Sequence, residues 1–274
     1  MSDDGITVLP RFMGEEGEKY FTLQFSCGDS PKAHIVFIPP FGEEMNRCRS
    51  LVSTQARSFA TAGYACTLID FYGTGDSQGE LCEASLKVWQ DNIRLTIDTL
   101  QGETSAPVIL WGLRLGGLIA LDYAAQTPGS TQDIILWQPV NAANVYVTQM
   151  LRQRVASLMV RDLPAETTRE IRQRLEQGEE VEIAGYSIGG LLIRDIEGID
   201  TASMSDLCSG KIFWLEHVTE AGKEIGVASR RSVDRLSQLG GRIEVITFSD
   251  PPIWLIHERD FAPELLAATG RLLP

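Results

Sequence analysis

Residues 107–125 read Pro-Val-Ile-Leu-Trp-Gly-Leu-Arg-Leu-Gly-Gly-Leu-Ile-Ala-Leu-Asp-Tyr-Ala-Ala. The apolar beginning of this stretch predicts a buried strand, and its end, rich in Leu and Ala, predicts a helix. Between them, Gly112, Gly116 and Gly117 permit a turn that is too tight for Cβ atoms on either side of the central residue. That central residue is Arg114. The stretch therefore predicts a strand, a sharp turn and a helix, with a guanidinium raised over the end of the strand.

This arrangement resembles the nucleophile elbow of α/β-hydrolases, in which Gly-x-Ser-x-Gly lifts a serine over the sheet. Arg114 stands at the position of that serine. A guanidinium stays protonated at neutral pH and cannot act as a nucleophile, and loss of the serine in subtilisin costs about 10⁶-fold in kcat. The resemblance implies a member of the serine hydrolase superfamily, and Arg114 predicts that its ordinary chemistry is impaired.

Composition limits the possible partners. The chain has 274 residues, 43% hydrophobic and 22% charged, which is ordinary for a globular protein with one large domain. The formal net charge of −13 disfavours nucleic acid and anionic membranes, because both require clustered Lys and Arg. Residues 1–5, Met-Ser-Asp-Asp-Gly, are acidic and are not followed by an apolar run of the kind found in leaders, and no run of about 18 uncharged apolar residues occurs in the sequence. We therefore expect a cytoplasmic protein without membrane insertion.

The cysteines and histidines restrict the chemistry further. Five cysteines are widely spaced and form no Cys-x-x-Cys pair, so neither a disulfide framework nor a metal site is indicated, and we expect no cofactor. The chain has three histidines, His34, His217 and His257. The search for a catalytic base is therefore short.

Strand and helix patterns alternate along most of the chain. Strands are expected at 20–26, 33–39, 64–70, 107–111, 133–138, 211–216 and 242–248, and helices at 47–63, 83–100, 115–126, 226–239 and 262–272. This alternation predicts a three-layer α/β/α hydrolase fold with a mostly parallel central sheet. Residues 1–140 and 208–274 are expected to form the core. Residues 141–207 depart from this alternation of strands and helices and are interpreted as an inserted, mostly helical cap.

The turn at residues 70–77 supports the same fold, and two backbone positions are candidates for an oxyanion hole. Residues 70–77, Asp-Phe-Tyr-Gly-Thr-Gly-Asp-Ser, resemble the turn that follows the fourth strand of these hydrolases and shapes the pocket wall. An oxyanion hole would take its N–H groups from near Phe41 and from Leu115, whereas Pro39 and Pro40 have no N–H to donate. These donors are expected even where the nucleophile is missing.

A second match to Gly-x-Ser-x-Gly occurs at Gly185-Tyr-Ser187-Ile-Gly189. The nucleophile of an α/β-hydrolase follows the fifth strand, and the order of the strands places 107–111 there. Ser187 falls after the sixth strand, inside the expected cap. A loop or the start of a short helix is therefore the favoured interpretation, and a relocated nucleophile is the alternative.

The positions of the base and the acid also depart from the hydrolase pattern. The base should lie in the turn after the last strand, but residues 248–254 read Phe-Ser-Asp-Pro-Pro-Ile-Trp, with Pro252 near the expected histidine. His257 lies beyond this turn, and His217 is closer to the usual place of the acid. Two carboxylates are available as the acid, Glu216 and Glu220. The acid of a triad acts by orienting the imidazole of the base, so it has no such role without a histidine. The nucleophile and base positions of the triad thus lack the expected residues.

Two roles for Arg114 follow from its place at a helix N-terminus. Unpaired N–H groups, the positive end of the helix dipole and a guanidinium together suit an anion, so a carboxylate or phosphate ligand, or a protein partner, is one hypothesis. The other is an internal ion pair, which is usual for buried arginines. Three carboxylates are candidates for that pair: Glu43, Glu44 and Asp70.

Four segments carry a more specific resemblance. They are Ile38-Pro-Pro-Phe-Gly-Glu-Glu-Met-Asn-Arg47, Trp111-Gly-Leu-Arg-Leu-Gly-Gly117, Leu136-Trp-Gln-Pro-Val140 and Asp250-Pro-Pro-Ile-Trp254. Together they resemble the second of two hydrolase-like proteins that accompany exosortase A systems in bacteria. The chain departs from that family at Ile253, where the family tends to carry phenylalanine. The resemblance implies a role near envelope polysaccharide or protein sorting.

The sequence leaves two functions open. In the first, a catalytically impaired hydrolase binds an anionic ligand or a partner at its former active site, through Arg114, Leu115, Phe41, Glu43, Glu44 and Asp70. In the second, an active ester or acyl hydrolase uses Ser187 as nucleophile with His257 as base and Glu216 as acid. The second requires the side chains of Ser187 and His257 to come within about 2.6 to 3.2 Å.

Overall fold

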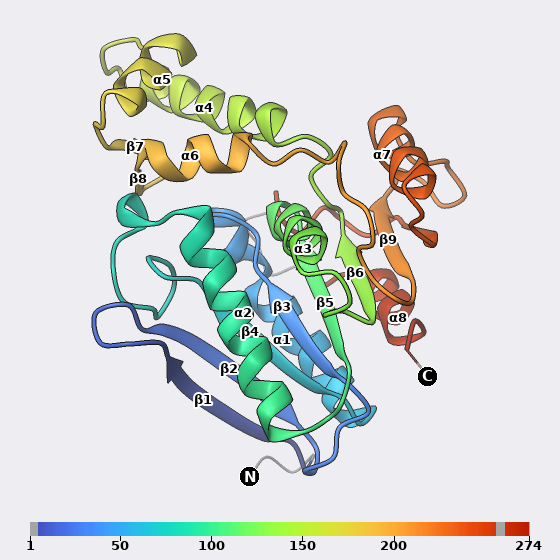
Figure 1. The fold of residues 1–274 in the computed structure, drawn as a ribbon. Helices are drawn as coiled ribbons and strands as arrows, with labels where there is room; N and C mark the ends of the chain where they lie inside the picture. Colours follow the sequence, from blue (N-terminus) through green and yellow to red (C-terminus); the bar gives the residue numbers. More distant parts are fainter. Residues whose placement is uncertain (1–4, 256–260, 274) are drawn as a thin grey trace.

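A mixed eight-stranded sheet forms the centre of the protein (Figure 1). The structure, a computed structural model, describes residues 5–255 and 261–273. The strands are β1 (Thr7–Met13), β2 (Tyr20–Ser26), β3 (His34–Ile38), β4 (Ala65–Asp70), β5 (Val108–Leu113), β6 (Asp133–Trp137), β9 (Ile212–His217) and β10 (Ile243–Phe248). Their order is β1-β2-β4-β3-β5-β6-β9-β10. β2 runs antiparallel to β1 and β4, and the other neighbouring strands of this sheet are parallel.

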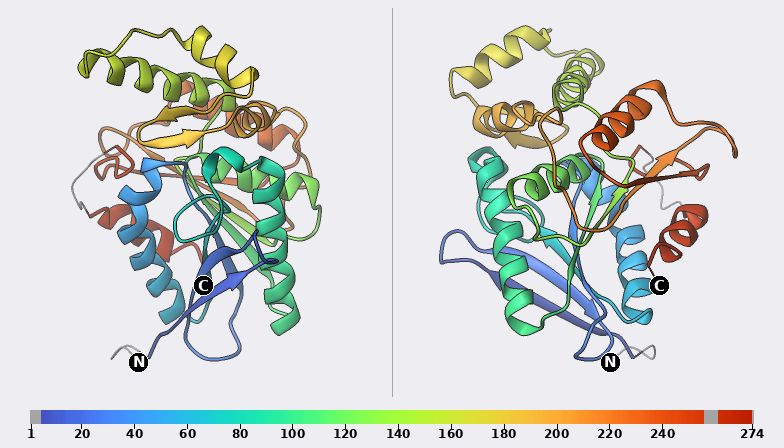
Figure 2. Two further views of the ribbon diagram at one scale, coloured as in Figure 1. Left: turned by 90° about the vertical axis from the view of Figure 1, so that its left-hand side faces the viewer. Right: turned by 45° about the vertical axis from the view of Figure 1, so that its right-hand side comes forward.

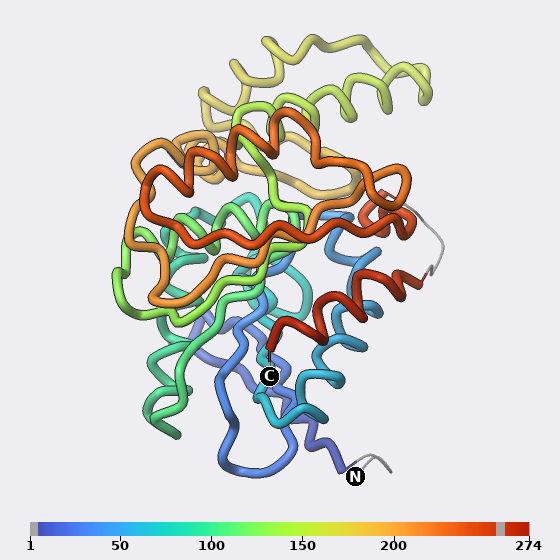
Figure 3. The backbone as a smooth tube through the Cα atoms, turned by 90° about the vertical axis from the view of Figure 1, so that its right-hand side faces the viewer, coloured from blue at the N-terminus to red at the C-terminus, as the bar shows by residue number. Residues whose placement is uncertain are grey.

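Helices cover both faces of the sheet. They are α1 (Glu43–Thr61), α2 (Leu86–Glu103), α3 (Leu115–Gln126), α7 (Val227–Gln238) and α8 (Pro263–Gly270), with the short 3-10 helix η1 (Leu81–Glu83) before α2. α1 and α8 lie side by side on one face (Figure 3). α2, α3 and α7 pack on the other face. The predicted three-layer fold is confirmed.

The central strand β5 shows why the sheet needs both layers. Every residue of β5 is buried, as expected for a parallel strand covered on both faces. Val108 and Leu110 face the core beneath α2 and α3, whereas Ile109, Trp111 and Leu113 face the core beneath α1 and α8. The alternation of side chains along the strand thus divides one apolar run between two cores.

Residues between β6 and β9 form a separate layer of α4 (Ala143–Val160), α5 (Thr168–Glu176), α6 (Gly190–Glu197) and the hairpin β7 (Val181–Ile183) and β8 (Tyr186–Ile188). Figures 1 and 2 show this layer above the sheet and its helices. Gly42, which follows the carboxyl end of β3 by a short turn, lies against the ring of Tyr186. The inserted layer therefore covers the end of the sheet at which the parallel strands terminate.

The strand β1 and the β7–β8 hairpin were not expected from the sequence. β1 carries Pro10, and a proline is tolerated at the edge of a sheet, where its missing N–H breaks no ladder between strands. The β7–β8 hairpin turns through Ala184 and Gly185, whose φ angles are 52° and 88°. Two successive positive φ angles are typical of a tight type I′ hairpin turn, so Gly185 serves the hairpin. Within the described residues, no helix is long and apolar enough to cross a membrane.

Candidate functional site

The turn after β5 has the strained geometry predicted for a nucleophile elbow. Arg114 stands between β5 and α3 with φ 55° and ψ −119°, a region that few residues with a Cβ adopt. A Cβ on Gly112 would lie 2.5 Å from Cα of Gly117, and a Cβ on Gly116 would overlap the carbonyl oxygens of Ile38 and Pro39. Close packing of β3, β5 and α3 therefore requires the glycines around Arg114.

The guanidinium of Arg114 forms an internal ion pair. Its Nε donates to Oε1 of Glu44 at 3.3 Å, and the Tyr146 hydroxyl donates to the other carboxylate oxygen, also at 3.3 Å. The Arg114 and Glu44 side chains are only 17% and 16% exposed. Nη1 of Arg114 also reaches the carbonyl oxygen of Gln138 at 3.5 Å. Of the three candidate carboxylates, the structure selects Glu44.

The other two carboxylates have partners of their own. Asp70 accepts from Nη2 of Arg49 at 3.0 Å and does not line the cleft around Arg114. Glu43 lies 3.8 Å from Nε of Arg47. Asp70 is therefore a structural residue of the 70–77 turn, where it also accepts from the backbone N–H of Asp76, whereas Glu43 lines the cleft.

Two aromatic rings hold the guanidinium in place. Cζ of Arg114 lies 5.4 Å from the centroid of the Trp254 ring and 6.0 Å from that of Tyr146. Cations within about 6 Å of a ring centroid are attracted by the ring quadrupole. Trp254 follows β10 and Tyr146 lies on α4, so the inserted layer and the core both contribute to the position of Arg114.

Burial and the ion pair have opposite effects on Glu44. Burial raises the pKa of Glu44, while the charge of Arg114 and the hydrogen bonds from Arg114 and Tyr146 act to lower it. Burial also raises the pKa of Tyr146 well above its usual value, and the carboxylate beside it acts in the same direction. At neutral pH the site thus holds a carboxylate that is more easily protonated than one in water.

A cleft of about 210 Å³ opens beside Arg114. Four charged side chains line it: Arg47, Arg114, Glu43 and Glu44. Glu43 and Glu44 begin α1, and Arg114 immediately precedes α3. Two helix N-termini therefore face one cleft, where backbone N–H groups and helix dipoles favour negative charge.

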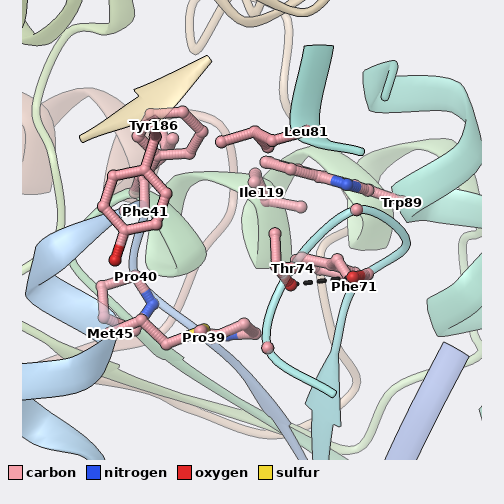
Figure 4. A pocket seen from close by; sticks show the side chains of 14 residues that line it. Pro39, Pro40, Phe41, Met45, Phe71, Thr74, Leu81, Trp89, Ile119 and Tyr186 are labelled. Carbon is pink, nitrogen blue, oxygen red and sulfur yellow. Dashed lines mark hydrogen bonds between the residues drawn. The ribbon is translucent and has the colours of Figure 1, made fainter. Parts of the chain in front are cut away.

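An apolar pocket of about 80 Å³ adjoins this cleft. Figure 4 shows Tyr186 and Phe41 along one wall and Leu81, Trp89 and Phe71 along the opposite wall. The rings of Phe71 and Trp89 are stacked, with centroids 4.8 Å apart and planes 8° apart. Three residues line both the cleft and the pocket: Phe41, Gly42 and Tyr186.

Phe41 and Leu115, the expected neighbours of an oxyanion hole, both line this apolar pocket. Leu115 is the first residue of α3, so its N–H precedes the first hydrogen bond of the helix. Both positions expected for the oxyanion hole therefore border the apolar pocket.

Ser187 lies on β8, where its hydroxyl donates to Oε2 of Glu180 at 2.7 Å. Its neighbours Tyr186 and Ile188 line the cleft, and the alternation of a strand turns Ser187 the other way. Gly189 packs against the carbonyl oxygen of Cys82. The second Gly-x-Ser-x-Gly match is thus part of a hairpin. His257 lies outside the described residues, so its distance from Ser187 stays untested.

The carboxylates near the usual acid position point elsewhere. Glu216 is buried and accepts from Trp214 Nε1 at 2.8 Å and from the Ser229 hydroxyl at 2.6 Å. Glu220 is exposed and pairs with Lys223 at 3.1 Å. The structure therefore brings Glu216 together with α7, and not with Ser187 or Arg114.

The turn after β10 presents an aromatic ring where a hydrolase would present its base. Leu255 N–H donates to the carbonyl oxygen of Pro252 at 2.8 Å, and this turn places Trp254 in the cleft. The His217 ring packs edge-to-face against the Trp254 ring, with ring centroids 6.0 Å apart. Among residues 5–255 and 261–273, no group of three His, Cys, Asp or Glu side chains is arranged to hold a metal ion.

The strand order, the elbow and the layer inserted after β6 define an α/β-hydrolase. A family model described as serine aminopeptidase, S33, matches residues 29–225, and the chain belongs to this family. The matched range includes the elbow with Arg114 in place of serine. Membership therefore defines the fold and ancestry of the site, while its chemistry depends on the residues now present.

Curated relatives cover part of the chain. A palmitoyl-protein thioesterase, ABHD10, from Homo sapiens is 29% identical over 147 residues, which is 54% of this chain and 42% of that protein. Monoglyceride lipase from Mus musculus is 25% identical over 188 residues, which is 68% of this chain and 61% of that protein. The chain thus spans less than two thirds of the length of these relatives.

Solved structures resemble the whole fold. Est1E from Butyrivibrio proteoclasticus with bound ferulic acid has a TM-score of 0.66 at 15% identity, over 95% of this chain and 96% of that chain. Alpha/beta hydrolase domain-containing protein 10 from mouse has a TM-score of 0.59 at 17% identity, over 97% and 98%. At these identities the similarity shows the fold alone.

Proposed function

We propose that this α/β-hydrolase-fold protein binds a carboxylate at its former active site and does not cleave esters by the serine mechanism. The observation that carries the proposal is Arg114, which keeps the backbone conformation of a nucleophile while its guanidinium holds a carboxylate, that of Glu44. In the bound state the carboxylate of the ligand takes the place of Glu44 on the guanidinium. Charge-assisted bonds between guanidinium and carboxylate are strong and directional, which suits recognition.

The charge balance of the cleft favours a monoanion. Arg47 and Arg114 are matched by Glu43 and Glu44, so the four side chains sum to zero when all are ionised. A carboxylate adds one negative charge, which is cancelled if Glu44 takes up a proton. A dianionic phosphate would leave at least one negative charge uncompensated in a partly buried cleft, and this is costly. A carboxylate is therefore preferred to phosphate.

The relatives also favour an acyl-derived ligand. One relative is named as a palmitoyl-protein thioesterase and the other as a monoglyceride lipase, and the substrates in both names carry acyl groups. A carboxylate is the free form of such a group. A site that descends from acyl hydrolysis but holds an arginine in place of serine is suited to retain an acid of this class.

We further propose that the protein functions in an exosortase or exopolysaccharide system. The four segments that resemble the exosortase-associated family all contribute to one site: Phe41, Arg114, Gln138 and Trp254 each come from a different segment. Deletion of the gene in a bacterium with such a system, complemented by the unchanged chain or by Arg114→Gln, tests this context. We expect only the unchanged chain to restore surface polysaccharide or protein sorting; restoration by both would contradict the proposed role of the site.

Titration of the purified protein with propionate, by calorimetry or by ligand-detected NMR, tests the binding itself. Arg114→Gln should weaken binding by about tenfold or more, because a hydrogen bond to a charged group contributes roughly 1.5–3 kcal/mol. Arg154→Gln is the matched control, because Arg154 is 15% exposed, pairs with Glu166 at 2.7 Å and does not itself line the cleft. Equal loss in both variants, or no loss in either, would refute the proposal.

Arg114→Ser tests whether the rest of a hydrolase site persists. We expect no hydrolysis of short esters and no labelling by a fluorophosphonate, because the turn after β10 presents Trp254 to the cleft and an unassisted serine is a weak nucleophile. Ester turnover that appears on this change alone would reveal a base in working position.

A further inference from the structure

The carboxylate site and the apolar pocket share a wall at the elbow. Arg114 lines the cleft, and the next residue, Leu115, lines the apolar pocket. Phe41 and Tyr186 border both spaces. The two spaces therefore meet at Phe41 and Tyr186, next to the elbow.

The walls of the apolar pocket offer hydrocarbon contacts. Trp89 Nε1 donates to the carbonyl oxygen of Tyr72 at 3.1 Å, and the Thr74 hydroxyl donates to that of Phe71 at 2.7 Å. The polar hydrogens of these two side chains are thus used within the protein. A polar group of a ligand that reaches the wall formed by Trp89 and Thr74 would lose its hydrogen bonds to water, at a cost of roughly 1–3 kcal/mol. The part of the ligand that enters is therefore apolar.

The volume of the pocket limits the length of that apolar part. An engineered cavity of about 150 Å³ holds benzene, and this pocket measures about 80 Å³. By proportion it holds roughly three carbon atoms. Its far wall is firm, because Leu81, Trp89 and Ile119 are 6%, 2% and 1% exposed, and Trp89 is stacked on Phe71. A palmitoyl chain is several times too long for this space.

We infer that the ligand is a short-chain carboxylic acid of about four to six carbons, whose carboxylate binds Arg114 and whose alkyl end fills the pocket between Phe41 and Trp89. This inference rests on the proposed function and adds the size and nature of the ligand tail. The inferred ligand also differs in length from the palmitoyl group in the name of one relative, because the pocket selects against long chains.

A series of straight-chain acids from acetate to octanoate tests the inference. Affinity should rise about fourfold per methylene group up to roughly five carbons and then fall, because longer tails meet Leu81 and Trp89. Arg114→Gln should weaken every member of the series. If the acids bind through Arg114 with no dependence on length, the inference fails and the proposed function stands. If no acid binds, the proposed function itself fails. If affinity still rises through octanoate, the short-tail limit is wrong.

Variants of the far wall test the same limit from the protein side. Leu81→Ala lengthens the pocket and should move the best acid to a longer chain by about two carbons. Leu100→Ala is the matched control, because Leu100 is 3% exposed in the same core but does not line the pocket. Ile119→Val, which removes one carbon, should favour the longer acids slightly and gives a milder variant if Leu81→Ala does not fold. An unchanged optimum in folded variants of both positions would overturn the inference.

Discussion

At the end of β5, Gly116 fits against the carbonyl groups of Ile38 and Pro39 with no room for a Cβ, and Arg114 keeps a φ of 55°. At the ends of β9 and β10, by contrast, Glu216 turns into a buried network with Ser229, and Trp254 occupies the cleft. The first turn keeps its backbone shape although its central side chain has changed. Within the described residues, the other two turns bring neither a histidine nor a carboxylate into the cleft.

The difference between these regions has a packing origin. The elbow is shaped by contacts among β3, β5 and α3, so its backbone contributes to the stability of the fold whatever side chain it carries. The turns after β9 and β10 include exposed residues, among them Glu220 and Leu255, and exposed loop positions can change side chain at little cost to packing. The shape of the elbow is thus set by the packing of its neighbours, and it does not require a serine at position 114.

The largest expected effect tests whether the elbow is required by packing. Gly116→Ala should reduce the free energy of unfolding by more than about 4 kcal/mol, because its Cβ would overlap backbone oxygens of β3 and the residue after it. Gly102→Ala is the control, since nothing lies within 4 Å of its Cβ position. It should stabilise α2 by about 0.5–1 kcal/mol. Urea unfolding measures both, and a mild effect of Gly116→Ala would break the comparison.

The next effect concerns the ion pair between Arg114 and Glu44. Arg114→Met should cost about 3 kcal/mol at neutral pH, because it leaves Glu44 charged, partly buried and without its cation. The double variant Arg114→Met with Glu44→Gln should recover part of this loss, with a coupling energy of about 1–2 kcal/mol. Urea unfolding of the four proteins gives the cycle. Strict additivity would show that the pair contributes nothing as a pair.

The loss in Arg114→Met should depend on pH. The folded-state pKa of Glu44 is raised by burial and held down by Arg114, so it rises further when Arg114 is removed. A carboxyl group with a raised folded-state pKa destabilises the fold above that pKa and ceases to do so when it is protonated. The deficit of Arg114→Met is therefore largest near pH 7 and shrinks as the pH falls below the raised pKa. A deficit that grows on acidification would contradict this assignment.

A smaller effect follows for ligand binding. When the carboxylate of a ligand displaces Glu44 from Arg114, Glu44 loses the interaction that lowers its pKa and takes up a proton. Binding of propionate should then strengthen by at most about tenfold for each pH unit as the pH falls from the pKa of Glu44 in the complex to its lower pKa in the free protein. Calorimetry in two buffers of different ionisation enthalpy counts the protons. Glu44→Gln should abolish this uptake while it keeps Arg114.

Much of the fold could be predicted from the sequence, because buried parallel strands leave continuous apolar runs and the elbow leaves closely spaced glycines. The β7–β8 hairpin escaped prediction, because Gly185 and Gly189 imitate an elbow pattern although one forms a tight turn and the other packs against Cys82. The local sequence does not indicate which neighbouring atoms leave no room for a side chain at a glycine position.

The candidate site was predictable only in part. Arg114, Glu43, Glu44 and Phe41 meet in the cleft as expected, but the choice of Glu44 over Asp70 depends on how α1 begins relative to the elbow. Tyr146 escaped prediction, because it comes from α4 and no motif surrounds it. Contacts between distant segments leave no pattern in the local sequence. The contacts of Arg114 with Glu44, Tyr146 and Trp254 can therefore be recognised only in the folded chain.

The smallest expected effect concerns Ser187, the residue that a motif search would select. Ser187→Ala removes one hydrogen bond to Glu180 on an exposed strand, so stability should change by less than about 0.5 kcal/mol. Binding of propionate and reactivity toward fluorophosphonate should also stay unchanged, because Tyr186 and Ile188, and not Ser187, line the cleft. Loss of fluorophosphonate labelling in this variant would instead place catalysis on the hairpin. The catalytic residue would then belong to β8 of the inserted layer and not to the turn after β5. The comparison between the elbow and the turns around it would then no longer describe the active site.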